Sequence, residues 1–169
     1  FAMVTEERRA TGIFAIMSVR DNTVISSLKK YLKNHLYLSN KTMQERTNWS
    51  INAMHIKTPT QQTQIRSLSG GNQQKIVIGK WLKSGFKVLL MDEPTRGVDV
   101  ATKHEIYLFL RELVAQGVAV LLVSTEIMEL MGISDRIYIF YEGRVHAELK
   151  GADINEEKVT YAIMGLKGE

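Results

Sequence analysis

Apolar residues follow two different periodicities along the chain, and the change falls near residue 86. From about 19 to 54 they recur at three- and four-residue spacing, which is typical of short helices. Beyond residue 86, the apolar runs 88–91 and 118–123 flank a helical stretch at about 100–116. Because continuous Val and Leu runs separated by a helix are typical of a parallel sheet covered on both faces, the pattern predicts an α/β fold.

The remaining segments predict the elements around this sheet. Residues 1–4 indicate a short buried strand, and a strongly charged loop follows at 5–12. A Thr-Pro-Thr break at 58–60 separates the first helices from a loop at 68–72, which runs into a further helix. After the second apolar run the pattern predicts a short helix, a hairpin turning at Glu142-Gly143 and a closing helix, at 127–131, 136–149 and 155–166.

Composition narrows the class of protein. The 169 residues are 44% hydrophobic and contain no Cys, which excludes a disordered chain, a disulfide scaffold and a thiolate metal site. Lys and Arg (22) exceed Asp and Glu (18) without forming a basic block, so the charge does not indicate a nucleic-acid surface. No apolar run approaches the about 20 residues that span a bilayer. We therefore expect any membrane association to depend on a partner.

Two carboxylates directly follow the first apolar run of the expected sheet. Asp92 and Glu93 stand at its end, before Pro94. In an open parallel sheet, ligands bind beyond the carboxyl ends of the strands. Asp92 is therefore a candidate Mg²⁺ ligand, and Glu93 is a candidate to orient and polarise an attacking water. A pair of acidic loop residues without a ligand is the alternative.

A Ser-Gly-Gly turn precedes the helix that is expected after the loop at 68–72. The two glycines, Gly70 and Gly71, allow backbone amides to approach an anion closely, and the Ser69 hydroxyl can donate a hydrogen bond to it. The following helix points its positive end at the same place. The alternative is that Ser69 only caps the helix, as serine commonly does.

Together, the two segments resemble the signature and Walker B motifs of the ATP-binding-cassette (ABC) ATPases. Leu68 lies 24 positions before Asp92, and residues 94–99 resemble the D-loop, which in this family crosses the interface between two ATPase halves. Asp99 also stands where the N-cap of the next helix is expected. The sequence of residues 68–75, with Asn72 where most cassettes carry Gln, is similar to that of the sugar-importer branch of the family.

The resemblance implies a P-loop NTPase fold of the ABC ATPase type, with a parallel sheet and a helical subdomain. It divides the chain into a Q-loop region (1–18), a helical signature subdomain (19–85) and a part with Walker B, the D-loop and the C-terminal strands (86–169). The sequence contains no Gly-x-x-x-x-Gly-Lys-Ser/Thr phosphate loop. Because that loop precedes the strand 1–4 in the family, we expect the chain to be the C-terminal portion of a domain, truncated at its N-terminus.

The resemblance also implies roles for individual residues, with ATP and Mg²⁺ as cofactors. Glu93 is the expected catalytic residue, and Asp92 is the expected metal ligand. The turn at Ser69 is expected to serve an ATP held by a second ATPase half. The expected nucleotide-contacting residues are Glu6, Ser69, Gly70, Gly71, Asn72, Gln73, Asp99 and Thr125.

Two of these residues depart from the family pattern. Glu6 best matches the position of the Q-loop Gln, and Thr125 occupies the position of the switch His. A hydroxyl cannot shuttle a proton as an imidazole does. Hydrolysis at the Walker B of this half is therefore in question.

For function, the resemblance implies an ATPase subunit that energises import of a monosaccharide, galactose or a methyl galactoside. We expect it to lie peripherally on the cytoplasmic face of the inner membrane and to be inactive alone. Expected partners are a second ATPase half, transmembrane permease subunits and, indirectly, a periplasmic sugar-binding protein, without nucleic acid. The charged loop Glu6–Arg9 and the helical region near Trp49 and Met54 are candidate docking surfaces for a transmembrane partner, although helical spacing favours a core position for Trp49 and Met54.

Two alternatives differ in class. One is a non-catalytic cassette half that supplies the signature motif to a partner's ATP site and couples motion to the membrane subunits, which Thr125 favours. The other is a soluble cassette protein that acts on ribosomes or DNA. The moderate charge and the absence of a basic stripe stand against the second alternative.

Overall fold

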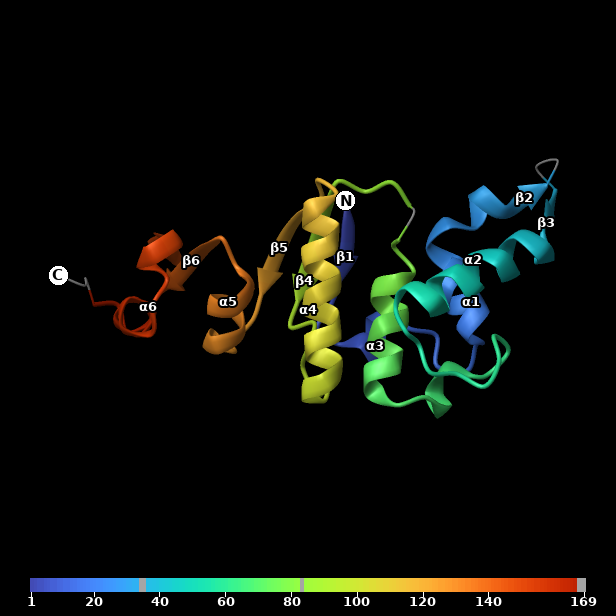
Figure 1. Ribbon diagram of the computed structural model, residues 1–169, viewed down its shortest axis with the longest axis horizontal. Coiled ribbons are helices and arrows are strands. Elements are labelled where there is room, and N and C mark those ends of the chain that lie inside the picture. The colour runs from blue at the N-terminus through green and yellow to red at the C-terminus, as the bar shows by residue number, and fades with distance from the viewer. Residues whose placement is uncertain (34–35, 83, 167–169) are drawn as a thin grey trace. The chain divides into compact units, whose positions relative to one another are not determined.

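A three-stranded sheet organises the first of the two units into which the chain divides, Phe1–Leu121 and Leu122–Glu169 (Figure 1). The computed structural model describes residues 1–33, 36–82 and 84–166. Strand β1 (Ala2–Val4) pairs in parallel with β4 (Val88–Asp92), and β5 (Ala119–Val123) lies on the other side of β4. This order confirms the parallel sheet of an α/β fold.

The two faces of this sheet are in different environments. Ala2 lies opposite Leu89 and Val4 opposite Met91, and all four side chains are buried. On the other face, Met3 is 50% exposed, and every second residue of β5 is exposed, Leu121 to 57%. The expectation of a sheet covered on both faces is therefore wrong for the residues that the structure describes. Alternation along strands β1 and β5 separates a packed face from an open apolar face.

The helical segment contains α1 (Val19–Val24), a 3₁₀ segment at Ile25–Tyr31, α2 (Asn40–Ala53) and α3 (Gly70–Gly79). A small antiparallel hairpin of β2 (Leu32–Lys33) and β3 (Tyr37–Leu38) interrupts it, where the sequence pattern predicts continued helix. Ser27 has a non-helical backbone (φ −142°), and Tyr31 is buried in a cluster with Val24 and Met43. The kink and this cluster end the helix before the exposed residues of the hairpin.

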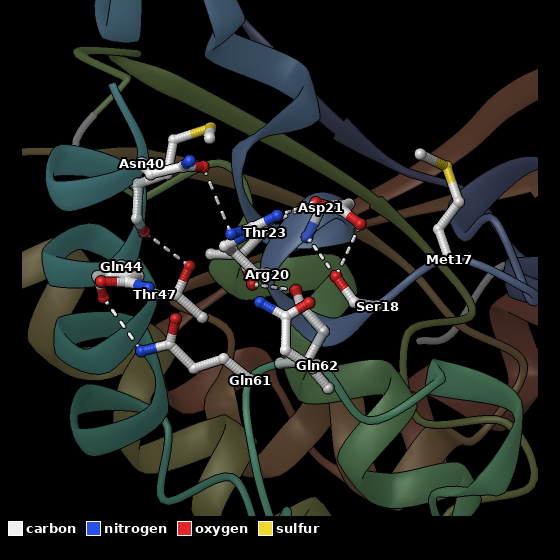
Figure 2. Close-up of polar contacts among 12 residues, drawn as sticks. Met17, Ser18, Arg20, Asp21, Thr23, Asn40, Gln44, Thr47, Gln61 and Gln62 are labelled. Atoms are coloured by element: carbon white, nitrogen blue, oxygen red, sulfur yellow. Dashed lines mark hydrogen bonds and ion pairs between the residues drawn. The ribbon is translucent and has the colours of Figure 1, made fainter. Parts of the chain in front are cut away.

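The segment that leads into α3 is tied to α1 and α2 by polar contacts (Figure 2). The backbone N–H of Val19 donates to the Thr63 carbonyl at 2.9 Å, and that of Ile65 donates to the Met17 carbonyl at 3.1 Å. The Gln61 side chain donates to the Gln44 carbonyl at 3.1 Å. A short 3₁₀ turn at Ile65–Ser67 then delivers the chain to Ser69.

The side chain of Arg46 in α2 contacts the end of α3. The guanidinium of Arg46 donates to the Gly79 carbonyl at 3.1 Å and lies 4.8 Å from the centroid of the Trp49 ring. Met54 is 4% exposed and belongs to the core, so it cannot contribute to a docking surface, whereas Trp49 is partly exposed. A basic side chain at a helix C-terminus satisfies carbonyls that have no helical partner.

The second unit pairs a hairpin with two helices. Strands β6 (Arg136–Tyr141) and β7 (Arg144–Lys150) turn at Glu142 (φ 48°) and Gly143 (φ 75°), the two left-handed residues that a type I′ turn requires. This confirms the predicted hairpin. Ile137 and Ile139 pack with Val159 of α6 (Glu156–Ile163) and are flanked by residues of α5 (Ile127–Ile133). Within the described residues, no helix is long and apolar enough to cross a bilayer.

Candidate functional site

Ser69 begins helix α3 and remains exposed at its N-terminus. Its Oγ accepts the backbone N–H of Asn72 at 3.4 Å and the side-chain amide of Asn72 at 2.9 Å. Both bonds use the hydroxyl as an acceptor, and within the described part of the chain its hydrogen finds no acceptor. Capping the helix and donating to an anion are therefore compatible roles for Ser69.

The two residues after the glycine pair turn their side chains to the protein. Asn72 Oδ1 accepts the backbone N–H of Lys57 at 2.7 Å, so both ends of its amide are engaged. Gln73 is 3% exposed, and its amide donates to the Leu68 carbonyl at 3.0 Å. These contacts hold the turn in shape, and nucleotide contact by the two side chains stays a prediction.

Gly71 lies where helix α3 approaches the first turn of α4 (Val100–Ala115). A Cβ on Gly71 would lie 2.8 Å from Thr102 Oγ1 and 2.9 Å from Thr102 Cγ2, and real Cβ atoms do not approach so closely. Thr102 itself is held by the N-cap of α4, because its N–H and its hydroxyl both donate to the Asp99 carboxylate at 2.9 Å. Gly71 thus brings the signature-like turn against the D-loop-like turn.

The exposed carboxylate of Asp99 serves as this N-cap. The hydrogen bonds from the Thr102 backbone and then from its side chain lower the pKa of Asp99 below its ordinary value, with a smaller contribution from Lys75. The carboxylate also lies at the positive end of helix α4. The N-cap alternative for Asp99 is therefore confirmed, and its role at an ATPase interface stays a prediction.

Asp92 and Glu93 lie where β4 ends, as the pattern predicts, and both are partly buried. Glu93 has φ +44°, in the left-handed region that non-glycine residues seldom adopt, and its carbonyl accepts the Arg96 N–H at 3.2 Å. The neighbouring Thr95 is 1% exposed. Backbone conformations of this kind are concentrated at functional sites, because the surrounding structure must hold them.

The donor set at this strand end fits Mg²⁺ only as part of a nucleotide complex. Among the residues that the structure describes, no group of three or more His, Asp or Glu side chains could hold a metal ion. Mg²⁺ is commonly held by one or two carboxylates together with substrate phosphates and water. Asp92 therefore fits as one ligand of a magnesium–nucleotide.

Glu6 and Thr125, the two residues that depart from the family pattern, lie in different units of the structure. Glu6 forms an ion pair with Arg96, so the segment after β1 reaches the D-loop-like turn. Thr125 lies in the second unit, between β5 and α5, and its role stays a prediction. The structure thus joins the segments of Glu6, the glycine pair and Asp99 within the first unit.

Sequence reasoning missed Thr102, and it placed Arg8 only in the charged loop Glu6–Arg9, without its contact in this arrangement. Thr102 occupies the third helical position after the cap at Asp99, where reciprocal capping contacts are common, so a local signal for it existed. Arg8 lies in a π-helical turn at Arg8–Gly12 and donates to the Arg96 carbonyl at 3.1 Å, 88 positions away. A contact of such separation leaves no local signal.

Comparison with known proteins agrees with this geometry. The pattern of the ABC transporter family matches residues 1–96. The galactose/methyl galactoside import ATP-binding protein of Fusobacterium nucleatum is 45% identical over 159 residues, which cover 94% of this chain and 32% of that protein. The arabinose import ATP-binding protein of Pectobacterium atrosepticum is 47% identical over 154 residues, or 91% of this chain and 30% of that protein. The chain spans about a third of the length of these curated relatives.

Solved structures show the same fold at lower identity. A nucleotide-free ATP-binding cassette from an ABC transporter superposes with a TM-score of 0.78 at 20% identity, covering 99% of this chain and 68% of that chain. A dimeric cassette in a post-hydrolysis state with ADP and Pi gives a TM-score of 0.74 at 21% identity, covering 88% and 62%. With its family pattern, relatives and fold in agreement, this chain belongs to the ABC transporter family as part of an ATP-binding cassette, and its relatives include ATP-binding proteins for galactose and arabinose import.

Proposed function

We propose that this chain is the signature-bearing part of an ATPase that energises import of a monosaccharide, galactose or a methyl galactoside. The observation that carries the proposal is the packing of Gly71 on Thr102, which joins the signature-like and D-loop-like turns in one surface. The names of the relatives supply the sugar class. In this assignment the protein works peripherally on the cytoplasmic face of the inner membrane, with permease subunits and a periplasmic sugar-binding protein.

The residues divide between two nucleotides. Ser69, with the amides of the glycine pair, contacts the phosphates of an ATP held by a second ATPase half, and Asp99 lies at the interface with that half. Asp92 holds Mg²⁺ on the nucleotide of this half, and Glu93 orients the attacking water. When bound, Mg²⁺ neutralises charge on the phosphates. Such an arrangement gives no tight ATP binding by the chain alone, because it contains no phosphate loop of the Gly-Lys-Ser/Thr type.

A segment swap tests the proposal. The matched part of the Fusobacterium nucleatum relative is replaced by this chain, in a cell that depends on that protein for galactose uptake. We expect the chimera to restore uptake and Ser69→Arg to abolish it, because a large cation would fill the turn that receives the phosphates. Thr58→Arg, at a partly exposed loop position of the same unit, is the matched control. Full uptake with Ser69→Arg, at an equal protein level, would contradict the proposal.

The second candidate function, a non-catalytic half that completes a partner's site, is favoured by Thr125 at the position of the switch His. The same chimera separates the two with Glu93→Gln. Loss of ATP turnover in this variant alone supports a catalytic half, whereas retained turnover supports the coupling role. Robust turnover by the isolated chain would contradict both, since neither provides a phosphate loop within it.

A further inference from the structure

Arg8 lies at the junction of three segments that the chain order keeps far apart. Its Nη1 donates to the Arg96 carbonyl at 3.1 Å, in the turn after β4. Its Nη2 lies over the first residue of α3, because a Cβ on Gly70 would be 2.7 Å from that nitrogen and 3.4 Å from the Gly97 carbonyl oxygen. One guanidinium therefore lies against both the start of the signature helix and the turn that follows Glu93.

Residue 96 is held at two points by the same short segment. While Arg8 binds its carbonyl, Glu6 forms an ion pair with the Arg96 side chain. The turn itself is tight, since Arg96 N–H donates to the Glu93 carbonyl and Val98 N–H to the Thr95 carbonyl, both at 3.2 Å. Gly97 adopts φ +66° freely, whereas Glu93, where the turn begins, has φ +44°. A non-glycine residue in this conformation needs contacts from its surroundings to keep it in place.

Burial of the Arg8 guanidinium costs free energy, because a charged group leaves water and one of its donors lacks a partner within the described part of the chain. Its Nε is buried and has no hydrogen-bond partner among the described residues. Burial, followed by the neighbouring charge of Arg9, lowers the pKa of the guanidinium, which nevertheless remains charged. Buried donors without partners are uncommon in folded proteins, and each one needs an explanation.

We propose that Arg8 is a positioning residue that locks the D-loop-like turn, through the Arg96 carbonyl, to the first turn of the signature helix at Gly70. A displacement of α3 at Gly70 is then passed to residues 96–98 through this side chain, and the reverse. The effect on catalysis rests on the proposed function. Arg8 itself contacts no nucleotide in this proposal. The contact itself can be measured without ATP.

Amide hydrogen exchange of the 169-residue chain tests the contact. In Arg8→Met, the amides of residues 96–98 are expected to exchange about five-fold faster or more, because a charged hydrogen bond to the turn is lost. Arg9→Met, which removes the exposed neighbouring arginine, is the matched control and leaves these amides unchanged. Arg8→Lys, which keeps the charge without the planar fork, gives an intermediate rate. Equal effects of Arg8→Met and Arg9→Met, or no effect of either, would overturn the proposal.

The catalytic arm uses the purified segment-swap ATPase. Arg8→Met is expected to lower kcat on the order of ten-fold, because the catalytic turn loses its position, with KM for ATP within about two-fold. A rise in KM with unchanged kcat would overturn the positioning role. If the unsubstituted chimera is itself inactive, the proposed function fails, and hydrogen exchange still decides whether Arg8 holds the turn. An unfolded Arg8→Met variant would show accelerated exchange throughout both units, in which case Arg8→Lys decides.

Discussion

Gly71 and Thr102 touch at the point where the first turns of helices α3 and α4 meet, with space for a hydrogen but not for a methyl group on Gly71. Thr102 cannot move aside freely, because its hydroxyl and its N–H are both bonded to Asp99. Close packing therefore requires glycine at position 71 of the signature-like turn, independently of any nucleotide.

Gly71→Ala is expected to lower the free energy of unfolding by about 1–3 kcal/mol, the usual cost of overpacking. Chemical denaturation monitored by circular dichroism measures it. Thr102→Ala in the Gly71→Ala background should recover part of the loss, since it removes the two nearest atoms. The control is Gly132→Ala in α5, where a Cβ would meet nothing within 4 Å and alanine favours the helix. Equal loss in both alanine variants would contradict the steric explanation.

Asp99 makes stability depend on acid pH. Because the Thr102 backbone and side chain lower the folded pKa of Asp99, its stabilising contribution is present above the ordinary pKa of about 3.9 and is lost as pH falls through the folded value. Asp99→Asn keeps a good N-cap without a titrating group. We expect its Tm to fall less than that of the wild type between about pH 4 and pH 2.

The pH comparison needs one correction for the second unit. Hydrogen bonds from Lys150 and then Tyr138 lower the pKa of Glu148, so this exposed carboxylate acts in the same direction. Asp99→Asn therefore removes only part of the acid dependence. Identical pH profiles of Tm for variant and wild type would show that the Asp99 cap does not contribute.

Lys75 and Glu105 form an ion pair that is buried at one end only. The Lys75 side chain is 6% exposed and also donates to the His55 carbonyl at 3.2 Å, whereas the Glu105 side chain is 45% exposed. Glu105→Gln leaves a buried cation without its counter-charge and should cost about 2 kcal/mol, discounted for the exposed partner. Lys75→Met should cost less, because a water-accessible carboxylate remains. Urea denaturation compares both with Glu112→Gln on the exposed side of α4, and the reverse order would contradict this account.

The two faces of the sheet predict opposite sensitivity to the same substitution. Leu89→Ala removes a fully buried side chain and should lower the free energy of unfolding by about 2–5 kcal/mol. Leu121→Ala removes a side chain that is 57% exposed and should cost less than about 1 kcal/mol. The two midpoints of denaturation, measured side by side, check the difference.

Local patterns predicted the parts of this fold that local physics determines. Alternation and turn chemistry located the hairpin at Glu142-Gly143, and the serine before Gly70 located the start of α3. The hairpin at Tyr37–Leu38 was missed, because exposed leucines at helical spacing imitate a helix while tertiary packing of Tyr31 ends it. The contact of Arg8 was missed because its partner is 88 positions away. The same holds for the candidate site. Its turns, which depend on local sequence, were predicted, whereas the contacts between distant residues that join the turns were not.

The sheet with one open face makes the first unit an amphiphile. Met3 and Leu121 present apolar surface to water, while the other side of the same strands is packed. Burying such a surface gains roughly 25 cal/mol per Å², so any apolar layer that fits it gains binding energy. Salts that strengthen apolar association, such as sulfate, should therefore promote association of the chain through this face, and a hydrophobic dye should bind to it.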